Sequence, residues 1–215
     1  AHRMPYGDGA EAEVIIMVDS SEGLDKPASD LNGYAVEQLL TPLTRRRNFD
    51  PSRHFAIDNG AFARFDPKKF RSLLAREWDR RELCRFVAVP DVVGSSRRTR
   101  EVFDVWSGEL HGWPLAYVLQ DGHESIDIPW TRVSAVFVGG TDRFKDSAVA
   151  IQSIKAAQLL GKWVHAGRVN TFARVQVFKQ LKVDACDGTG VARYTHMREA
   201  MTQTPTLFSA EEIVN

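Results

Sequence analysis

A chain of 215 residues with no Pro- or Gly-rich linker and no internal repeat is expected to form a single domain, residues 1–215, around one large core. Its longest apolar runs, such as Val14–Val18 and Phe86–Pro90, are far too short to cross a bilayer, which excludes a membrane-spanning helix. Lys and Arg together number 28, as do Asp and Glu, so the chain lacks the overall positive field of tight non-specific nucleic-acid binders.

Short apolar runs rich in Val, Ile and Phe recur along the chain and predict β-strands. In chain order they are Val14–Val18, His54–Ile57, Arg85–Pro90, Leu115–Leu119, Ala135–Gly139, Trp163–Ala166 and Val183–Cys186. Stretches with helical periodicity alternate with these runs. The predicted helices are Tyr34–Leu43, Pro67–Glu77, Ser95–Leu110, Phe144–Leu160, Thr171–Leu181 and Tyr194–Met201. The interval from Val18 to His54 leaves room for an eighth strand.

This alternation indicates a parallel sheet covered by helices, either open or closed into a barrel. Strand after strand is followed by charged, polar or Gly residues. These segments are Asp58-Asn59-Gly60, Pro90-Asp91, Gln120-Asp121-Gly122, Gly139-Gly140-Thr141, His165-Ala166-Gly167-Arg168 and Asp187-Gly188-Thr189-Gly190. In a β/α barrel such ends converge on one mouth, whereas an open sheet gathers them only near one switch point. We therefore predict a TIM-like (β/α) barrel of seven to eight parallel strands, compact or incomplete.

The cysteines and the amino end bear on compartment and cofactors. Cys84 and Cys186 lie in different apolar runs and are too few for a disulfide scaffold, so we expect buried free thiols. No Cys/His cluster has metal-ligand spacing, and we expect neither a metal nor another cofactor. The first residues, 1–4, contain no apolar signal region, and Met4 is interpreted as the start behind a cloning remnant. A cytoplasmic protein is expected.

Two carboxylates at strand ends are the candidate catalytic groups. Asp58 is followed by a turn-forming Gly60 and the aromatic Phe62, a pattern that combines a proton acceptor with an apolar wall. Asp187 precedes a Gly-rich turn that could expose it for attack on a sugar carbon. The alternative for both residues is structural, because Asp commonly caps turns and Phe commonly packs in cores.

Several of these segments resemble motifs of the tRNA-guanine transglycosylase family. Asp58-Asn59-Gly60-Ala61-Phe62 is similar to the family's Asp-Ser-Gly-Gly-Phe motif, and Val183–Asp187 to its Asp-x-x-Asp segment, here with Asp184 as the first acid. Between them, in the family's order, lie the segments that contain Asp91, Gln120, Gly139-Gly140 and His165-Ala166-Gly167. The resemblance covers residues 54–195.

The resemblance implies a base exchange in a polynucleotide, with guanine replaced by a 7-deazaguanine. Asp187 would attack the sugar C1′ and form a covalent intermediate, and Asp58 would act as general acid and base. The predicted substrate-binding residues are Phe62, which would stack on the base, together with Asp91, Gln120, Gly139, Gly140, His165, Gly167, Arg168 and Asp184. Arg168 is predicted to hold a backbone phosphate, with an ordinary ion pair as the alternative. His165 is predicted to be a ligand or an acid, with a strand-end residue hydrogen-bonded to its neighbours as the alternative.

The chain lacks two features of the tRNA enzymes, their zinc site and their greater length. Short zinc-free relatives of phage type are implicated in placing 7-deazaguanines in DNA, and His165–Asn170 resembles theirs. We therefore expect DNA rather than tRNA as the nucleic-acid partner, together with a deazapurine base, and the host cytoplasm as location for a phage-encoded protein. A partner protein or a homodimer stays open, and no membrane partner is expected.

Other functions remain open at this stage. One is a tRNA-guanine transglycosylase, and another is an N-glycosidase or transferase acting on free nucleosides or nucleotides, since the same two carboxylates would serve a small substrate. A third, from outside the enzymes, is a barrel that only binds nucleic acid or a partner protein. His123 and Glu124 lack a third ligand at suitable spacing and are interpreted as loop residues rather than a metal site.

Overall fold

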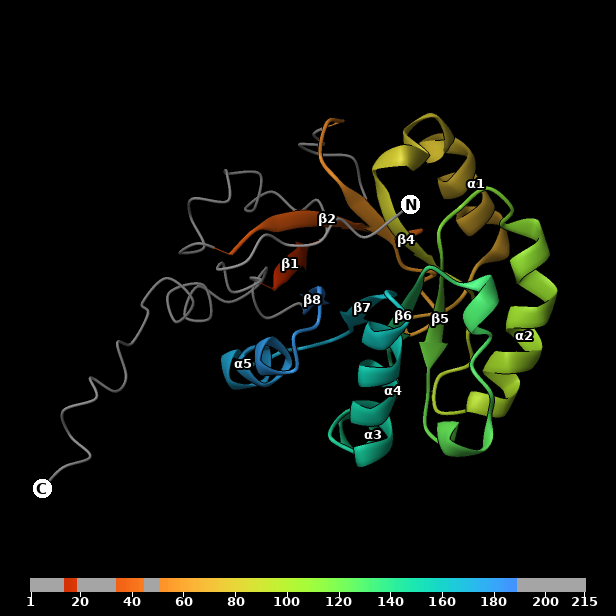
Figure 1. Cartoon of the computed structure of the whole chain (residues 1–215). Helices are drawn as coiled ribbons and strands as arrows, with labels where there is room; N and C mark the ends of the chain where they lie inside the picture. Colours follow the sequence, from red (N-terminus) through yellow and green to blue (C-terminus); the bar gives the residue numbers. More distant parts are fainter. Residues whose placement is uncertain (1–13, 19–33, 45–50, 189–215) are drawn as a thin grey trace, which may run out of the picture.

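Eight parallel strands close into a barrel in the computed structural model, which describes residues 14–18, 34–44 and 51–188 (Figure 1). The strands are β1 (Ile15–Val18), β2 (Val36–Leu40), β3 (Phe55–Ile57), β4 (Cys84–Ala88), β5 (Leu115–Leu119), β6 (Ala135–Val138), β7 (Trp163–Ala166) and β8 (Ala185–Asp187). Each strand pairs with the next in chain order, and β8 returns to pair with β1, with Cys186 opposite Ile16. The predicted TIM-like barrel is confirmed, with eight strands.

The strand β2 corrects the prediction of a helix over Tyr34–Leu43. Val36–Leu40 is extended and lies between β1 and β3, with Val36 opposite Ile16 and Leu40 opposite Ile57. Pro42 follows closely and prevents a helix from continuing, because its ring removes a backbone donor and favours an extended residue before it. The segment is too short for its periodicity to distinguish a strand from a helix. Its pairing with β1 and β3, which closes the barrel, makes it a strand.

In the described part of the chain, five α-helices lie outside the barrel. They are α1 (Pro67–Glu77), α2 (Ser96–Glu109), α3 (Asp142–Lys145), α4 (Ala148–Leu159) and α5 (Phe172–Gln180). Each starts after a residue whose side chain accepts a backbone N–H of the first turn, and these caps are Asp66, Ser95, Thr141, Ser147 and Thr171. Short 3-10 turns complete the connections, η2 (Trp78–Leu83), η3 (His123–Ser125) and η4 (Trp130–Arg132). The helix predicted over Tyr194–Met201 lies outside the described residues.

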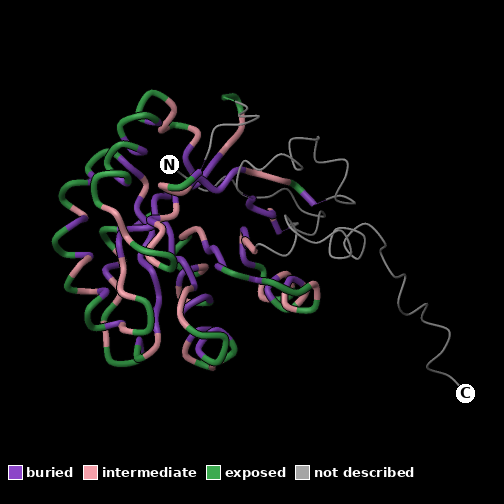
Figure 2. The backbone as a smooth tube through the Cα atoms, turned by 180° about the vertical axis from the view of Figure 1, so that it is seen from behind, coloured by how far each residue is buried: buried purple, intermediate pink, exposed green. Residues whose placement is uncertain are grey.

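The alternation of side chains along the strands divides the core into two layers. One layer fills the barrel and consists largely of Ala, with Phe86 and Phe137 as its bulkiest members. The other lies between the barrel and the helices and includes Phe55, Phe70 and Tyr117. Figure 2 shows the strands buried and the outward turns of the helices exposed. Small residues inside the barrel leave space at its carboxyl-terminal end.

Cys84 and Cys186 are both buried free thiols, as predicted. Within the described residues, no helix combines the length and the apolar character that a membrane crossing requires.

Candidate active site

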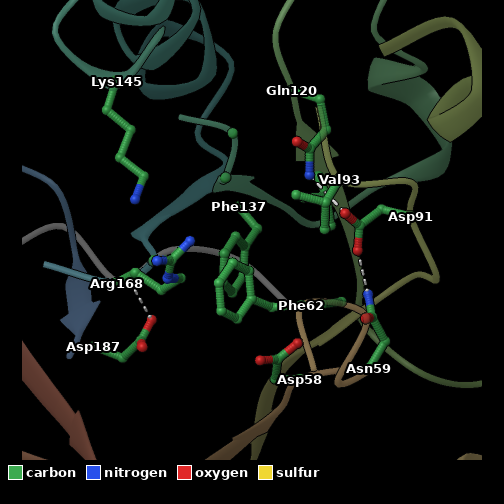
Figure 3. A pocket seen from close by; sticks show the side chains of 15 residues that line it. Asp58, Asn59, Phe62, Asp91, Val93, Gln120, Phe137, Lys145, Arg168 and Asp187 are labelled. Carbon is green, nitrogen blue, oxygen red and sulfur yellow. Dashed lines mark hydrogen bonds between the residues drawn. The ribbon is translucent and has the colours of Figure 1, made fainter. Parts of the chain in front are cut away.

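A pocket opens at the carboxyl-terminal mouth of the barrel, where the loops after several strands meet (Figure 3). It is lined by Asp58, Asn59, Phe62, Ala88, Asp91, Val93, Val118, Gln120, Phe137, Gly139, Gly140, Lys145, Gly167, Arg168 and Asp187. Side chains of the inner layer form its floor. A wider groove adjoins it and shares Asp58, Phe62, Arg168 and Asp187 with it. The mouth is therefore one continuous opening with the two predicted catalytic carboxylates at its centre.

Asp58 is the first residue after β3 and both shapes the turn and lines the pocket. Its Oδ1 accepts the N–H of Gly60 at 3.1 Å, and Gly60 adopts a φ of 76°, which favours glycine. Burial, together with the negative charges of Asp187 and Asp91, raises the pKa of Asp58 to about 7. A carboxyl group with this pKa can both give and take a proton near neutral pH.

Asp187 is the last residue of β8 and is oriented by hydrogen bonds from β7 and the loop after it. His165 Nε2 lies 2.8 Å from Asp187 Oδ1, and the N–H of Arg168 donates to the same oxygen at 3.2 Å. Within the described residues, Oδ2 of Asp187 has no hydrogen-bond partner. His165 is fully buried against the rings of Phe86 and Phe137, so it holds the carboxylate rather than meeting a ligand itself.

Asp91 and Gln120 belong to a hydrogen-bonded network along one wall of the pocket. Asn59 Nδ2 donates to Asp91 Oδ1 at 2.8 Å, and Gln120 Nε2 donates to Asp91 Oδ2 at 2.6 Å. Gln120 Oε1 in turn accepts the N–H of Gly94 at 2.9 Å. Burial raises the pKa of Asp91, while the bonds from Asn59 and Gln120 act in the opposite direction. The network holds the side chains of Asp91 and Gln120, both predicted binding residues, each in one orientation.

Phe62 and Arg168 stack on one another at the entrance. The guanidinium carbon of Arg168 lies 3.6 Å from the centre of the Phe62 ring, and 61% of Phe62 is exposed. Arg168 has a φ of 56°, which side chains other than glycine seldom adopt. The ion pair that was the alternative role for Arg168 is not found with any described residue.

The glycines at the mouth are explained by close packing. A Cβ at Gly139 would lie 2.9 Å from a Val118 methyl carbon, and one at Gly167 would lie 2.3 Å from the Phe137 ring. Gly140, with a φ of 70°, leaves no room for a Cβ beside Asp121 and Phe144. All three line the pocket, as predicted, but each is needed for the contacts of neighbouring side chains rather than for an approach to a ligand.

Two predicted binding residues line neither pocket, His165, which is fully buried beside Asp187, and Asp184. Asp184 precedes β8 at the amino-terminal end of the strand, where its Oδ2 accepts the N–H of Val164 at 2.8 Å. It lines neither pocket. The spacing of two acids on one strand suggested a shared site, but Asp184 and Asp187 sit at opposite ends of β8.

Six residues that line the pocket were not predicted from the sequence, Asn59, Ala88, Val93, Val118, Phe137 and Lys145. Asn59 follows Asp58 directly, and its position after a strand was a usable signal. Phe137 points inward from β6 in an unbroken apolar run, where periodicity does not separate inner from outer positions. Lys145 lies at the end of α3, within a segment predicted as one amphipathic helix, so nothing distinguished it from a solvated charge.

Within the described residues, no group of three or more His, Cys, Asp or Glu side chains is placed to hold a metal ion. The pocket instead offers three carboxyl groups, Asp58, Asp91 and Asp187, and two cationic groups, Lys145 and Arg168. Such a set can exchange protons and bind charge. The arrangement fits acid–base chemistry on a polar substrate.

Comparison with known proteins gives matches only among solved structures. No family model matches the chain, and no curated protein matches it. The PaMucR phosphodiesterase in complex with c-di-GMP is similar at 12% identity and a TM-score of 0.40, covering 65% of this chain and 61% of that one. The FimX EAL domain of Xanthomonas citri in complex with c-di-GMP is similar at 16% identity and a TM-score of 0.40, covering 65% and 59%. The matched region thus spans about three fifths of each of these chains.

These findings correct the predicted function. Two of the solved structures that match are a phosphodiesterase and an EAL domain rather than transglycosylases, which contradicts the predicted base-exchange transglycosylase. The tRNA-acting enzyme, the small-substrate N-glycosidase or transferase and the non-catalytic nucleic-acid-binding barrel do not fit these neighbours either. At this identity and TM-score, the neighbours' own ligand is not transferred to this chain. DNA and a deazapurine as partners stay untested predictions.

Proposed function

We propose that the chain is an enzyme that performs general acid–base catalysis on a small polar substrate at the mouth of its barrel. The observation that carries this proposal is that the carboxyl groups of Asp58 and Asp187 line one pocket, where burial and the neighbouring acids raise the pKa of Asp58 to about 7. Carboxyl groups with such a raised pKa cluster at catalytic sites, because there they can exchange protons at physiological pH.

The geometry supports a division of labour between the two carboxyl groups. Asp58 transfers a proton to or from a substrate heteroatom. Asp187, held by His165, faces the same space with Oδ2 available and stabilises positive charge that develops during the reaction. Asp91 and Gln120 form a rigid polar wall that orients the substrate.

The first test needs no substrate. Carbon-13 NMR of the Asp side chains should show Asp58 titrating near pH 7 in the wild-type protein. In Asp187→Asn the pKa of Asp58 should fall, because one of the negative charges that raise it is gone, but burial should keep it above 3.8. Asp127→Asn, which removes an exposed carboxylate that lines neither pocket, should leave the pKa of Asp58 unchanged. An Asp58 that titrates near pH 4 in the wild type would contradict the proposal.

A second test measures turnover with nitrophenyl phosphate esters, carboxylic esters and O-glycosides as chromogenic probes. A probe that is accepted should show kcat/KM changing around pH 7. Its turnover should fall by about 100-fold or more in Asp58→Asn, since general acid–base catalysis contributes at least that factor. Accepted probes that are turned over equally by the wild type and Asp58→Asn would also contradict the proposal.

A further inference from the structure

Lys145 is a buried cation whose charge is poorly compensated within the protein. Only 1% of its side chain is exposed, yet its sole ion pair among the described residues is a 3.7 Å contact with Asp142. The Asp142 side chain is 73% exposed and is shared with Arg174 at 3.5 Å. Burying an ammonium group costs several kcal/mol unless close partners offset it. This distant and solvated carboxylate offsets little of that cost.

The amino group of Lys145 reaches into the catalytic pocket. Lys145 comes from the end of α3, after β6, and Figure 3 shows its side chain extending toward Arg168 and Asp187. Burial is the largest influence and lowers the pKa of Lys145. The negative charges of Asp142 and Asp187 raise this pKa, and the positive charge of Arg168 lowers it. The effect of Arg168 shows that the two cations lie close enough to repel each other.

Arg168 supplies the second cation from the neighbouring connection, after β7. Its backbone N–H is bonded to Asp187, but within the described residues its guanidinium group has no carboxylate partner and is placed only by the Phe62 ring. Its φ of 56° is unfavourable for any side chain and would cost a glycine nothing. Strain of this kind persists where surrounding contacts enforce it, and it is common at binding sites.

We propose that Lys145 and Arg168 together form a binding site for an anionic group of the substrate, a phosphate or a carboxylate, beside Asp58 and Asp187. The site rests on the proposed function, since it names the class of substrate on which that chemistry acts. An anion between the two side chains relieves their repulsion and gives the buried ammonium the close partner that the protein lacks. Asp187 attracts the Lys145 charge but is not that close partner, because within the described residues it makes no ion pair or hydrogen bond with Lys145.

The test is a calorimetric titration of the full chain with inorganic phosphate and, separately, with acetate, at pH 7 and low ionic strength. The wild type should bind one of the two anions. Lys145→Met and Arg168→Met should each weaken that binding by about tenfold or more, the loss expected for one charge-assisted hydrogen bond. Lys155→Met, which removes an exposed lysine from α4, should bind as the wild type does. The anion that binds identifies the group as a phosphate or a carboxylate.

Folding of the variants separates a binding role from a structural one. Lys145→Met should be folded and at least as stable as the wild type, because an apolar side chain of similar length removes a buried charge. Should Lys145→Met fail to fold, Arg168→Met decides the question, since the Arg168 side chain is exposed. Absence of binding of both anions by the wild type overturns the proposal, as does unchanged binding in the folded variants.

Asp58→Asn distinguishes failure of this site from failure of the proposed function. The variant should bind the anion at least as tightly as the wild type, because it removes no cation from the pocket. Anion binding that depends on Lys145 and Arg168, combined with an Asp58 that titrates near pH 4, leaves the anion site standing and removes the proposed chemistry. If Asp58 titrates near pH 7 and neither anion binds, the proposed chemistry stands and the anion site is removed.

Discussion

Asp58 ties the stability of the folded chain to pH. Its pKa is about 7 in the folded protein and 3.8 for an ordinary Asp of an unfolded chain, so the folded state holds the proton more tightly. The stability that this preference provides is fully present below pH 3.8 and is lost as the pH rises through 7. The difference between the two pKa values corresponds to about 4 kcal/mol at most.

Asp58→Asn should therefore be more stable than the wild type at pH 8 and should gain little at pH 4. The amide has the shape of the carboxyl group but is never charged, so the cost of burying the charge disappears. Urea unfolding of both proteins at pH 4, 6 and 8 measures the effect. Asp127→Asn is the control and should show no such trend. Parallel stability curves for the wild type and Asp58→Asn would rule out a raised Asp58 pKa.

Gly167 sets the position of the Phe137 ring, which in turn packs on His165. A methyl group at residue 167 would lie 2.3 Å from that ring, so Gly167→Ala must displace Phe137. We expect a loss of about 1–3 kcal/mol in the free energy of unfolding, as in other overpacked cores. Gly108→Ala is the matched control, because Gly108 lies in α2 with nothing near its Cβ position and should gain up to about 1 kcal/mol. Equal effects of the two substitutions in thermal denaturation would contradict this account.

At the scale of single residues, the sequence was informative where side chains follow buried strands. Asp58 and Asp187 were predicted to meet because each directly ends an apolar run, and the pocket brings them together. Lys145 could not be found this way, since its burial depends on a helix break that periodicity does not reveal. The function drawn from the motifs was wrong although the residues meet, because Asp and Gly after barrel strands serve many reactions.

At the scale of elements, the break between α3 and α4 is set by Ser147. The sequence predicts one helix over Phe144–Leu160, but Ser147 is extended and its hydroxyl accepts the N–H of Ala150 at 3.2 Å, which starts a new helix. Ser147→Ala should lower the free energy of unfolding by about 1 kcal/mol. Ser147→Asp keeps a capping oxygen and should lose little. Chemical denaturation that finds the two variants equal would show that the cap does not stabilise α4.

The elements that the sequence predicted best are those bounded by strong local signals. Pro67–Glu77 agrees residue for residue with α1, because Asp66 and Pro67 mark its start. The segment that became β2 lacked such signals. Its five residues carry a mixed pattern, and their extended conformation is imposed by hydrogen bonds to β1 and β3 rather than by their own preference.

At the scale of the whole molecule, the barrel depends on its first strand. Ile16 is 1% exposed, and its neighbours across the sheet are Val36 on β2 and Cys186 on β8. Ile16→Ala should lower the free energy of unfolding by about 3 kcal/mol, the usual cost of such a cavity. Val105→Ala, at a position 69% exposed on α2, should change it little. Equal midpoints for the two variants in urea unfolding would mean that the packing of β1 contributes little to stability.

The pairing of β8 with β1 has a consequence for the protein during its synthesis. Asp187 reaches the pocket only when β8 fills the last place between β7 and β1. A nascent chain that has released β1 to β7 while β8 is still inside the ribosome holds Asp58, Asp91 and Gln120 but lacks the opposing carboxylate. Under the proposed chemistry such a chain is inert, and activity starts only as translation delivers the final strand.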